Sequence, residues 1–481
     1  MISRKTISIS FALVSIITII RLLFIGNTML IDDEAYYAIY SHHLDWGYID
    51  HGPVVAYIIY FFTFLIENSF TVRLGGIVLL TTLCYFLYQF GKVFYDKKTG
   101  IILALTVCIN MLFHTNAVVI TPDAPLSFFS ILTIIYYYKS YFKDENYLIL
   151  AGLFLGLSML SKVSALFIAI GIFIFPIAIK EKQYLLKNIK FYYSFLIAFI
   201  VFLPFIIWNL QNELAFVKYQ GNHILGKGNF QTFSELWLGL FILCGPILFY
   251  YTITIPIRYL INIKNISNEK IYFCFVTGIP LLYFLIHSSF SRMELNWPAP
   301  VFMGGIFLFA IHVSENWKRL KKQFVFQILF SLFLIIVVTT QTFYPILSLN
   351  KKADITNRYY KYQSIIYDLS EYLNNFPELK EKRILSNNFQ IPSIINFYLK
   401  PKLEAGCLSI GYHETLYSFL YPDKKYIGDN FLYLSKSSQF PNKIKPYFSN
   451  IKLIKQFSSK RDSKIISEFS LWEANGYSGK Q

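Results

Sequence analysis

The sequence predicts an α-helical, polytopic membrane protein that carries a small α/β domain at its C-terminal end. Hydrophobic residues make up 55% of the 481 residues, and charged residues make up only 15%. Apolar runs of about 18 or more residues recur along the chain, and each is long enough to cross the hydrocarbon core of a bilayer. The segment 348–481 differs, because it is more polar and contains turn residues and a helical stretch near 359–375. It also has short β-branched or aromatic strings: Lys382-Arg383-Ile384-Leu385, Lys425-Tyr426-Ile427 and Phe431-Leu432-Tyr433-Leu434.

About eleven crossings are predicted from the lengths of the apolar runs. The first, 7–27, lacks a small-x-small cleavage site, so we expect a retained helix rather than a signal peptide. The stretch 54–66 is apolar but short, which favours a helix lying at the membrane interface. The other crossings are expected near 70–91, 99–119, 125–142, 147–160, 163–180, 190–208, 234–258, 270–287, 298–315 and 323–346.

The distribution of lysine and arginine predicts the orientation. Cytoplasmic loops are enriched in these residues, and the formal net charge of +16 indicates basic loops beside anionic lipid headgroups. The basic loops fall on one side, which we take as cytoplasmic: 92–98, 139–143, 180–190, 258–270 and 318–322. The segments 28–69, 120–124, 209–233 and 288–297 then lie on the external side, together with everything after about 347.

Several function classes lack the sequence features that they need. No basic motif is concentrated in a soluble module, so nucleic acid is not an expected partner. The five cysteines form no CxxC pair and no zinc spacing, so neither a structural disulfide nor cysteine chemistry is expected. The sequence also lacks a phosphate-binding P-loop and a credible dinucleotide fingerprint.

The first external segment, 28–69, concentrates acidic residues between a spanning helix and the interfacial helix. It contains Asp32-Asp33-Glu34 and, further on, Asp50-His51-Gly52-Pro53. A carboxylate beside a membrane is costly unless it has a partner or a task. One interpretation is a catalytic loop that holds a base or binds a cation. The other is a solvated loop in which Asp32 or Asp33 caps a short helix.

Asp123 marks a second external site, in Thr-Pro-Asp-Ala-Pro. Aspartate is well suited to cap the helix that follows, and a cap and a catalytic role are compatible. Lys162 interrupts an apolar stretch, and it either reaches the headgroups or binds a lipid phosphate. Arg73, Lys218, Lys227 and Arg292 are further phosphate candidates, although for each alone a generic interfacial anchor is the favoured interpretation.

Six short motifs in this order resemble the bacterial membrane glycosyltransferases of the protein O-mannosyltransferase type, glycosyltransferase family 39. This family includes the lipid A aminoarabinose transferases. The resemblance covers roughly residues 30–300. Its motifs are Asp33-Glu34-Ala35-Tyr36-Tyr37, Tyr48-Ile49-Asp50-His51-Gly52-Pro53, Thr121-Pro122-Asp123-Ala124-Pro125-Leu126, Leu157-Ser158-Met159-Leu160-Ser161-Lys162, Trp208-Asn209-Leu210-Gln211-Asn212 and Glu294-Leu295-Asn296-Trp297-Pro298-Ala299-Pro300.

The resemblance implies the GT-C fold, with about 11–13 transmembrane helices in residues 1–347 and a soluble periplasmic domain in 348–481. It implies catalytic roles for Asp33, Asp123 and the neighbouring Glu34. Substrate-binding roles are implied for Tyr37, His51, Lys162, Arg292, Asn296, Trp297 and Asn209. This chain has His51-Gly52-Pro53 where lipid A aminoarabinose transferases have a lysine before a double proline, so aminoarabinose is not assigned as the sugar.

The expected function is transfer of a sugar from a polyprenyl (undecaprenyl) phosphate donor to a cell-envelope acceptor, with lipid A of lipopolysaccharide as the expected acceptor. The expected location is the bacterial inner membrane, with the site on the periplasmic face and membrane lipids around the bundle. No cofactor is required, and a divalent metal ion held by the acidic loop is left open. The alternatives are transfer to another glycan or to protein, a secondary transporter or lipid flippase, and a non-catalytic assembly protein.

Overall fold

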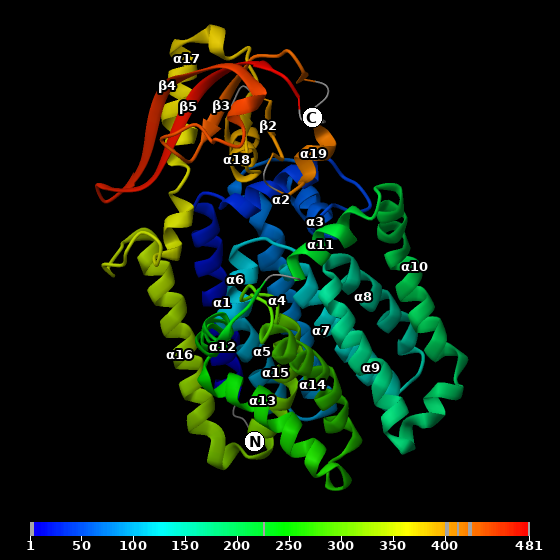
Figure 1. Cartoon of the computed structure of the whole chain (residues 1–481). Helices are drawn as coiled ribbons and strands as arrows, with labels where there is room; N and C mark the ends of the chain where they lie inside the picture. Colours follow the sequence, from blue (N-terminus) through cyan, green and yellow to red (C-terminus); the bar gives the residue numbers. More distant parts are fainter. Residues whose placement is uncertain (1–3, 225–226, 400–403, 411–412, 422–425, 480–481) are drawn as a thin grey trace.

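The chain folds into a long bundle of helices with a mixed α/β layer packed on one end (Figure 1). The computed structural model describes residues 4–224, 227–399, 404–410, 413–421 and 426–479. The helices of the bundle are α1 (Arg4–Gly26), α4 (Ser69–Phe94), α5 (Lys97–Ile109), α6 (Met111–Val118), α7 (Asp123–Phe142), α8 (Tyr147–Ser161), α9 (Leu166–Ala178), α10 (Ile189–Gln211), α11 (Ala215–Ile224), α12 (Phe230–Cys244), α13 (Pro246–Ile261), α14 (Asn268–Ser288), α15 (Ala299–Glu315) and α16 (Trp317–Phe343).

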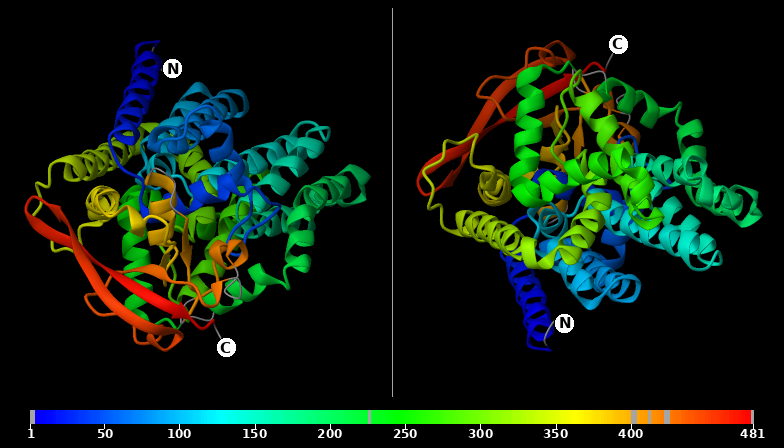
Figure 2. Two further views of the ribbon diagram at one scale, coloured as in Figure 1. Left: turned by 90° about the horizontal axis from the view of Figure 1, so that it is seen from above. Right: turned by 90° about the horizontal axis from the view of Figure 1, so that it is seen from below.

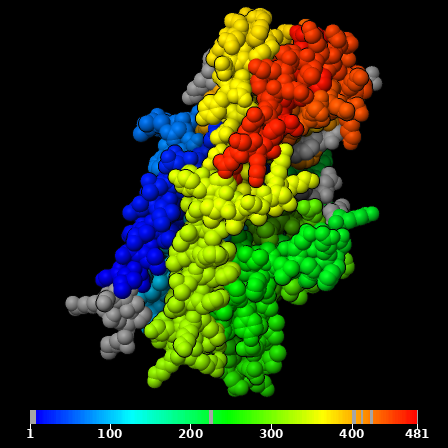
Figure 3. Space-filling model, turned by 90° about the vertical axis from the view of Figure 1, so that its left-hand side faces the viewer, coloured from blue at the N-terminus to red at the C-terminus, as the bar shows by residue number. Residues whose placement is uncertain are grey.

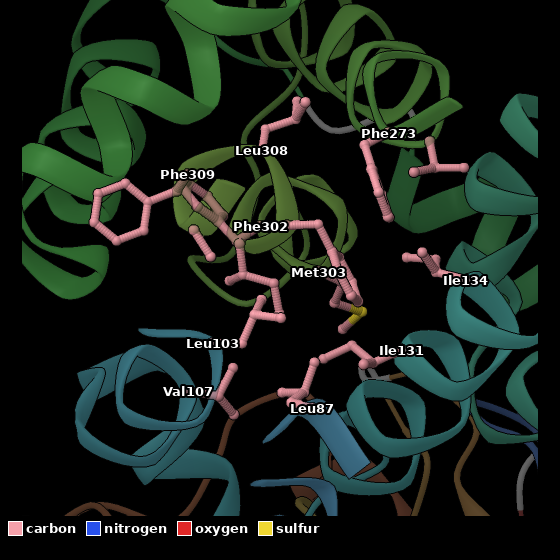
Figure 4. Close-up of a cluster of buried hydrophobic side chains, with 14 of the residues drawn as sticks. Leu87, Leu103, Val107, Ile131, Ile134, Phe273, Phe302, Met303, Leu308 and Phe309 are labelled. Atoms are coloured by element: carbon pink, nitrogen blue, oxygen red, sulfur yellow. The ribbon is translucent and has the colours of Figure 1, made fainter. Parts of the chain in front are cut away.

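Two helices that are apolar on all sides form the centre of the bundle. Nearly every residue of α15 is buried, and α5 is buried from Thr99 to its end at Ile109. Such helices have no polar face and must be enclosed by others. Figure 4 shows their side chains meeting in one cluster, where Phe302 and Met303 of α15 lie close to Leu103 of α5. This core holds the segment before α15, which contains Asn296 and Trp297, in a fixed place.

Helices α1 and α16 lie on the outside of the bundle, along the face shown in Figure 3. Only 22% of the residues in the apolar stretch of each helix are buried. Their exposed residues are large and apolar, for example Ile19 on α1 and Phe333 on α16. An apolar outer surface of this kind is what lipid chains would contact.

Five described helices are long and apolar enough to cross a membrane, and up to eight spans result if each bent pair counts as one. The five are α1, α4, α10, α14 and α16. The crossing predicted at 234–258 is bent within its length. Helix α12 ends at Cys244, and α13 starts at Pro246 after a bend of 112°. Gly245 has a φ of +84° at the bend, a conformation that favours glycine.

The first external segment forms two short helices, α2 (Asp32–His42) and α3 (Val54–Thr63). Helix α2 lies between the bundle and the α/β layer (Figure 1). Helix α3 exposes Phe61, and the residues after it expose Phe64 and Leu65 strongly. A short helix with such an apolar edge is consistent with the predicted interfacial position.

The C-terminal segment contains one five-stranded sheet in the order β2-β1-β3-β5-β4. The first three strands in that order pair in parallel, and β5 pairs antiparallel with both β3 and β4. The strands and helices are α17 (Ser370–Asn375), β1 (Ile384–Ser386), α18 (Gln390–Tyr398), β2 (Ala405–Cys407), α19 (Leu416–Leu420), β3 (Phe431–Ser435), β4 (Phe448–Arg461) and β5 (Lys464–Tyr477).

The predicted α/β character of this segment is confirmed, and so is its small sheet. Strands β1 and β3 fall on two of the predicted strings, and a helical stretch covers most of 359–375. In the third string, Lys425-Tyr426-Ile427, Lys425 lies outside the described residues, and the other two are not in a strand. The long β4–β5 hairpin was not predicted. It extends along one side of the molecule in both views of Figure 2.

The α/β layer is attached to the bundle at several points. Helix α18 packs on α2. The hydroxyl of Tyr36 on α2 accepts a hydrogen bond of 2.9 Å from the amide of Leu416. At the tip of the hairpin, Arg461 donates to the carbonyl oxygens of Gln341 and Thr342 at the end of α16. These contacts fix the layer over the first turn of α2.

Candidate functional site

The first turn of α2 carries the acidic residues of the first motif. Negative side chains are favourable there because the helix dipole is positive at its N-terminus. Neither Asp32 nor Asp33 caps the helix, because Ile31 occupies the cap position and makes no side-chain bond. Both carboxylates instead contact Arg358, whose Nη2 lies 2.5 Å from Asp32 Oδ1 and 2.7 Å from Asp33 Oδ2. The side chain of Asp33 remains 39% exposed, whereas that of Asp32 is 7% exposed.

Their surroundings shift the pKa values of Asp32 and Asp33 in opposite directions. Burial, and then the negative charge of Asp32, raise the pKa of Asp33 against the opposing effect of Arg358. Burial acts in the same direction on Asp32, but Arg358 and Lys361 outweigh it and lower the pKa of Asp32. Asp32 is therefore held as an anion, and Asp33 is the more basic and more accessible of the two. That combination suits Asp33 to accept a proton.

Glu34 was predicted to be catalytic, and the structure places it in a buried ion pair instead of at an open surface. Its side chain is fully buried, and both oxygens are bound by Arg73, at 2.7 Å from Nε and 2.5 Å from Nη2. The amides of Ile120 and Ile31 complete its hydrogen bonds, at 2.9 and 3.0 Å. No substrate atom can reach this carboxylate. Glu34 and Arg73 instead hold the start of α2 against α4, so Arg73 is not a phosphate contact.

Asp123, Lys162 and Asn296 come together from three separate motifs. Lys162 Nζ lies 2.8 Å from Asp123 Oδ1, and Asn296 Nδ2 donates to Asp123 Oδ2 at 2.5 Å. Asp123 is 3% exposed and makes no helix-capping bond. Lys162 is 14% exposed, so it does not reach into headgroups as one interpretation expected. Asp123 compensates the charge of Lys162 and orients Asn296, which makes it a positioning residue in this arrangement.

A cavity of about 500 Å³ opens beside this triad. His51, Lys162, Arg292 and Trp297 all line it, as the motifs predicted. Arg292 is exposed and forms no ion pair with any described residue, so its charge is available to a ligand. Five other lining residues are aromatic and come from α9, α11 and α14: Phe167, Phe216, Tyr219, Tyr283 and Phe284. One carboxylate, that of Glu294, also lines the cavity. A cavity with aromatic side chains, two cations and one carboxylate fits a ligand that joins an apolar chain to a polar, anionic group.

Gly52 explains how His51 reaches this wall. A Cβ at Gly52 would overlap the carbonyl oxygen of Leu160, in the last turn of α8. Only glycine allows the two backbones to approach so closely. Since Lys162 follows directly after α8, this contact places His51 and Lys162 on the same cavity wall.

Tyr37 connects the cavity to Asp33. It lies one helical turn after Asp33 on the same face of α2, about 5–6 Å along the axis. Its ring packs edge-on against the ring of His51 at 5.8 Å. Burial, and then the charges of Asp50, Asp33 and Asp123, raise the pKa of Tyr37, which places its hydroxyl in the field of all three carboxylates. Tyr37 therefore stands between the acidic turn and the cavity.

Asn209 was predicted to bind substrate, but the structure gives it a different role. Its Oδ1 accepts a hydrogen bond of 3.1 Å from the amide of Phe216, and its Nδ2 donates to the carbonyl oxygen of Phe205 at 3.4 Å. Asn209 is buried and does not line the cavity. It joins α10 to α11 and so positions the cavity wall that contains Phe216 and Tyr219.

Sequence reasoning missed two groups at this site. Arg358 is 325 residues from Asp33, and no local motif marked it. Asp50 lies inside a quoted motif, yet it was not assigned a role. It is half-buried and accepts a hydrogen bond from Tyr40, and desolvation raises the pKa of Asp50 to about 6. Among the described residues, no three His, Cys, Asp or Glu side chains gather as a metal site would require.

Comparison with known proteins gives one family match and one curated relative. Residues 50–208 match the family model of the dolichyl-phosphate-mannose-protein mannosyltransferases. The lipid A galacturonosyltransferase RgtD of Rhizobium johnstonii is 24% identical over 299 residues. That match spans 60% of this chain and 61% of the relative.

Two solved structures have a similar fold over the whole chain. ArnT from Cupriavidus metallidurans bound to undecaprenyl phosphate has a TM-score of 0.65 at 12% identity, with all of both chains covered. The apo state of the same protein has a TM-score of 0.64 at 11% identity, with 99% of both chains covered. The likeness to these structures establishes the fold. With the family match and the curated relative, it confirms the resemblance seen in the motifs: the chain has the GT-C fold of ArnT and is similar to membrane glycosyltransferases, among them a lipid A transferase.

Proposed function

We propose that the protein transfers a sugar from a polyprenyl phosphate donor to lipid A, on the external face of the bacterial inner membrane. The cavity carries this proposal, because its aromatic walls and the uncompensated Arg292 match the two halves of such a donor. A lipid-linked donor partitions into the bilayer and needs a site at membrane level. The names of the similar proteins, a lipid A galacturonosyltransferase and a protein bound to undecaprenyl phosphate, support the same donor and acceptor classes.

Arg292 has the simplest role in this proposal. The acceptor oxygen attacks the anomeric carbon of the sugar, the bond from that carbon to the phosphate oxygen breaks, and polyprenyl phosphate leaves. Negative charge builds on the leaving phosphate in the transition state, so a cation aimed at it lowers the barrier. Lys162 contributes less charge, because Asp123 neutralises it. Trp297 adds an aromatic surface to the same wall, and Asn296 supports Asp123 behind it as a hydrogen-bond donor.

Asp33 acts on the acceptor. If the acceptor group is a hydroxyl, Asp33 takes its proton as the bond to the sugar forms. If the acceptor group is a phosphate, it is already ionised, and Asp33 helps to position it. The described carboxylates of the acidic turn are bound by Arg358 and Lys361, so the mechanism assigns them no metal-binding role.

Mass spectrometry of lipid A tests the proposal. Cells with the gene should contain lipid A carrying one added sugar, and cells without it should lack that species. Wild-type protein supplied in trans should restore the modification, and Asp33→Asn should not. Unchanged lipid A together with a changed glycan or protein would reject the acceptor. No change in any envelope component would reject the function.

A further inference from the structure

Three cations converge on the acidic turn of α2 from the C-terminal segment. Arg358 contacts Asp32 and Asp33, and Lys361 Nζ lies 3.3 Å from Asp32 Oδ2. Lys436, just after β3, lies near Lys361 and the ring of Tyr362. The ammonium groups of Lys361 and Lys436 lie 5.0 and 5.6 Å from the centre of the Tyr362 ring. We call Arg358, Lys361 and Lys436 the cation cluster.

The cation cluster has more positive charge than its carboxylates compensate. It contains three cations, and the two carboxylates in contact with it are Asp32 and Asp33. Among the described residues Lys436 has a neutral partner, Gln390, which accepts its hydrogen bond at 3.1 Å, and no carboxylate within ion-pair distance. Desolvation, and then the neighbouring charge of Lys361, lower the pKa of Lys436 to about 8. The positive charges of Lys361 and Lys436 repel each other, and an anion bound between them would reduce this repulsion.

The position of the cluster indicates which anion would bind. Helix α2 lies between the helix bundle and the α/β layer (Figure 1), at one end of the apolar bundle, where a lipid headgroup could reach it. Arg358 belongs to the short segment that follows the long apolar helix α16. An anion held here would also lie beside Asp33, whose side chain is partly exposed. Only one nitrogen of Arg358, Nη2, is engaged by the two aspartates, so its remaining N–H groups can bind a second anion.

We propose that Arg358, Lys361 and Lys436 form the binding site for a phosphate group of the lipid acceptor, next to Asp33. This site is separate from the cavity that we assign to the donor. Lysine and arginine side chains bind phosphate through short, charge-assisted hydrogen bonds. The cluster would hold the acceptor in register with the sugar, and a lipid without the phosphate would bind weakly. The identification of the acceptor as lipid A rests on the proposed function.

Binding without a donor tests this site. The full chain is placed in nanodiscs of phosphatidylcholine and mixed with diphosphorylated lipid A, or with the same lipid after its phosphates are removed. Wild type should bind the phosphorylated form at least about tenfold more tightly, the scale of a lost charge-assisted hydrogen bond. Lys361→Gln and Lys436→Gln should each remove most of that preference. Equal binding of the two lipids by wild type, or an unchanged preference in both variants, would overturn the proposal.

Lys455→Gln is the matched control, because Lys455 is also a lysine of the α/β layer and lies 4.6 Å from the centre of a tyrosine ring, that of Tyr372. It should keep the full preference. Arg358 is not substituted, because its loss would leave Asp32 buried without its main partner. Lys436→Gln breaks no ion pair, so its melting temperature should equal that of wild type.

Two competition experiments distinguish a phosphate of lipid A from other phosphate groups. Phosphatidylglycerol in the nanodisc, or millimolar inorganic phosphate, should not displace lipid A. Displacement by either at a matched phosphate concentration would show a general anion site and reject the acceptor assignment. Normal sugar transfer without a phosphate preference would overturn only this site. A phosphate preference without sugar transfer would overturn only the proposed function.

Discussion

Asp33 and Glu34 are neighbouring carboxylates with opposite surroundings, and these surroundings decide their roles. Asp33 is 39% exposed and contacts Arg358 through one oxygen. Glu34 is fully buried, and Arg73 and two backbone amides use its hydrogen-bonding capacity. At the residue scale we therefore propose the exposed member of the pair as the reactive group, whereas the buried member supports the helix that carries it.

Asp33→Asn should reduce sugar transfer by about 10²-fold or more, the scale of lost acid–base assistance. Folding should be nearly unchanged, because asparagine can keep a hydrogen bond to Arg358. Glu34→Gln should behave in the opposite way. It leaves Arg73 buried without its countercharge, which costs about 3–5 kcal/mol of stability. Transfer assays and melting temperatures of both variants check this contrast. Normal transfer by Asp33→Asn would show that the acidic turn is structural.

Arg292→Met and Lys162→Met should differ in the same manner. Arg292 is exposed and lacks an ion-pair partner among the described residues, so its loss should weaken donor binding by about 1.5–3 kcal/mol and leave stability unchanged. Lys162→Met leaves Asp123 buried and unpaired, so the protein itself should be destabilised. Donor titration and thermal melting separate the two effects. Unchanged donor affinity in both variants would make these residues ordinary interfacial side chains.

Most of the residues that the sequence could identify lie within short motifs. Asp33, His51, Lys162, Asn296 and Trp297 were found in this way, and Arg292 was found as a cation of an external segment. The structure brings all of them except Asp33 to the cavity wall or its triad. Burial and pairing could not be foreseen. Nothing local distinguishes Glu34 from Asp33, and Arg358 joins the site only through the docking of the α/β layer.

At the element scale, the segment that links α2 to α3 determines the geometry of the site. Gly52 lets this segment approach the backbone of α8, and that approach sets His51 beside Lys162. A second glycine explains a bend that the sequence did not predict. The apolar run 234–258 is long enough for one crossing, but the chain bends by 112° at Gly245 within it. The length of an apolar helix can be predicted from hydropathy. A bend depends on the backbone conformation of a single residue, which hydropathy does not indicate.

Gly52→Ala should lower the melting temperature and reduce transfer together. The added methyl group meets the carbonyl oxygen of Leu160, which belongs to a helix backbone and cannot move freely. Overpacking of this kind costs about 1–3 kcal/mol. Gly278→Ala in α14 is the matched control, since its added methyl group would have no atom of a neighbouring element within 4 Å. It should be neutral or slightly stabilising. Equal melting temperatures for both variants would contradict the role given to Gly52.

At the scale of the whole molecule, the basic loops and the α/β layer lie at opposite ends. The connections from α9 to α10 and from α13 to α14 are at the end of the bundle away from the sheet (Figure 1). Both carry several lysine or arginine residues, which favours a cytoplasmic location. The α/β layer, the acidic turn and the cavity beside it would then face the periplasm, away from cytosolic nucleotide sugars.

A reporter that functions only in the cytoplasm should be silent when fused after Gln481 and active when fused in the loop at Lys264. A reporter that needs the periplasm should give the reverse result. The pair of fusion sites is internally controlled, because each reporter must distinguish the two ends of the same protein. An active cytoplasmic reporter at the C-terminus would place the proposed site on the wrong face.

Donor selection by the purified protein tests the central claim most directly. In nanodiscs that contain lipid A, the protein should transfer the sugar from a polyprenyl-phosphate sugar and release polyprenyl phosphate, because the cavity has apolar walls and a cation for these two parts. It should leave a nucleotide sugar untouched, because the sequence has no nucleotide-phosphate motif. Turnover of the nucleotide sugar without any lipid carrier would contradict the account.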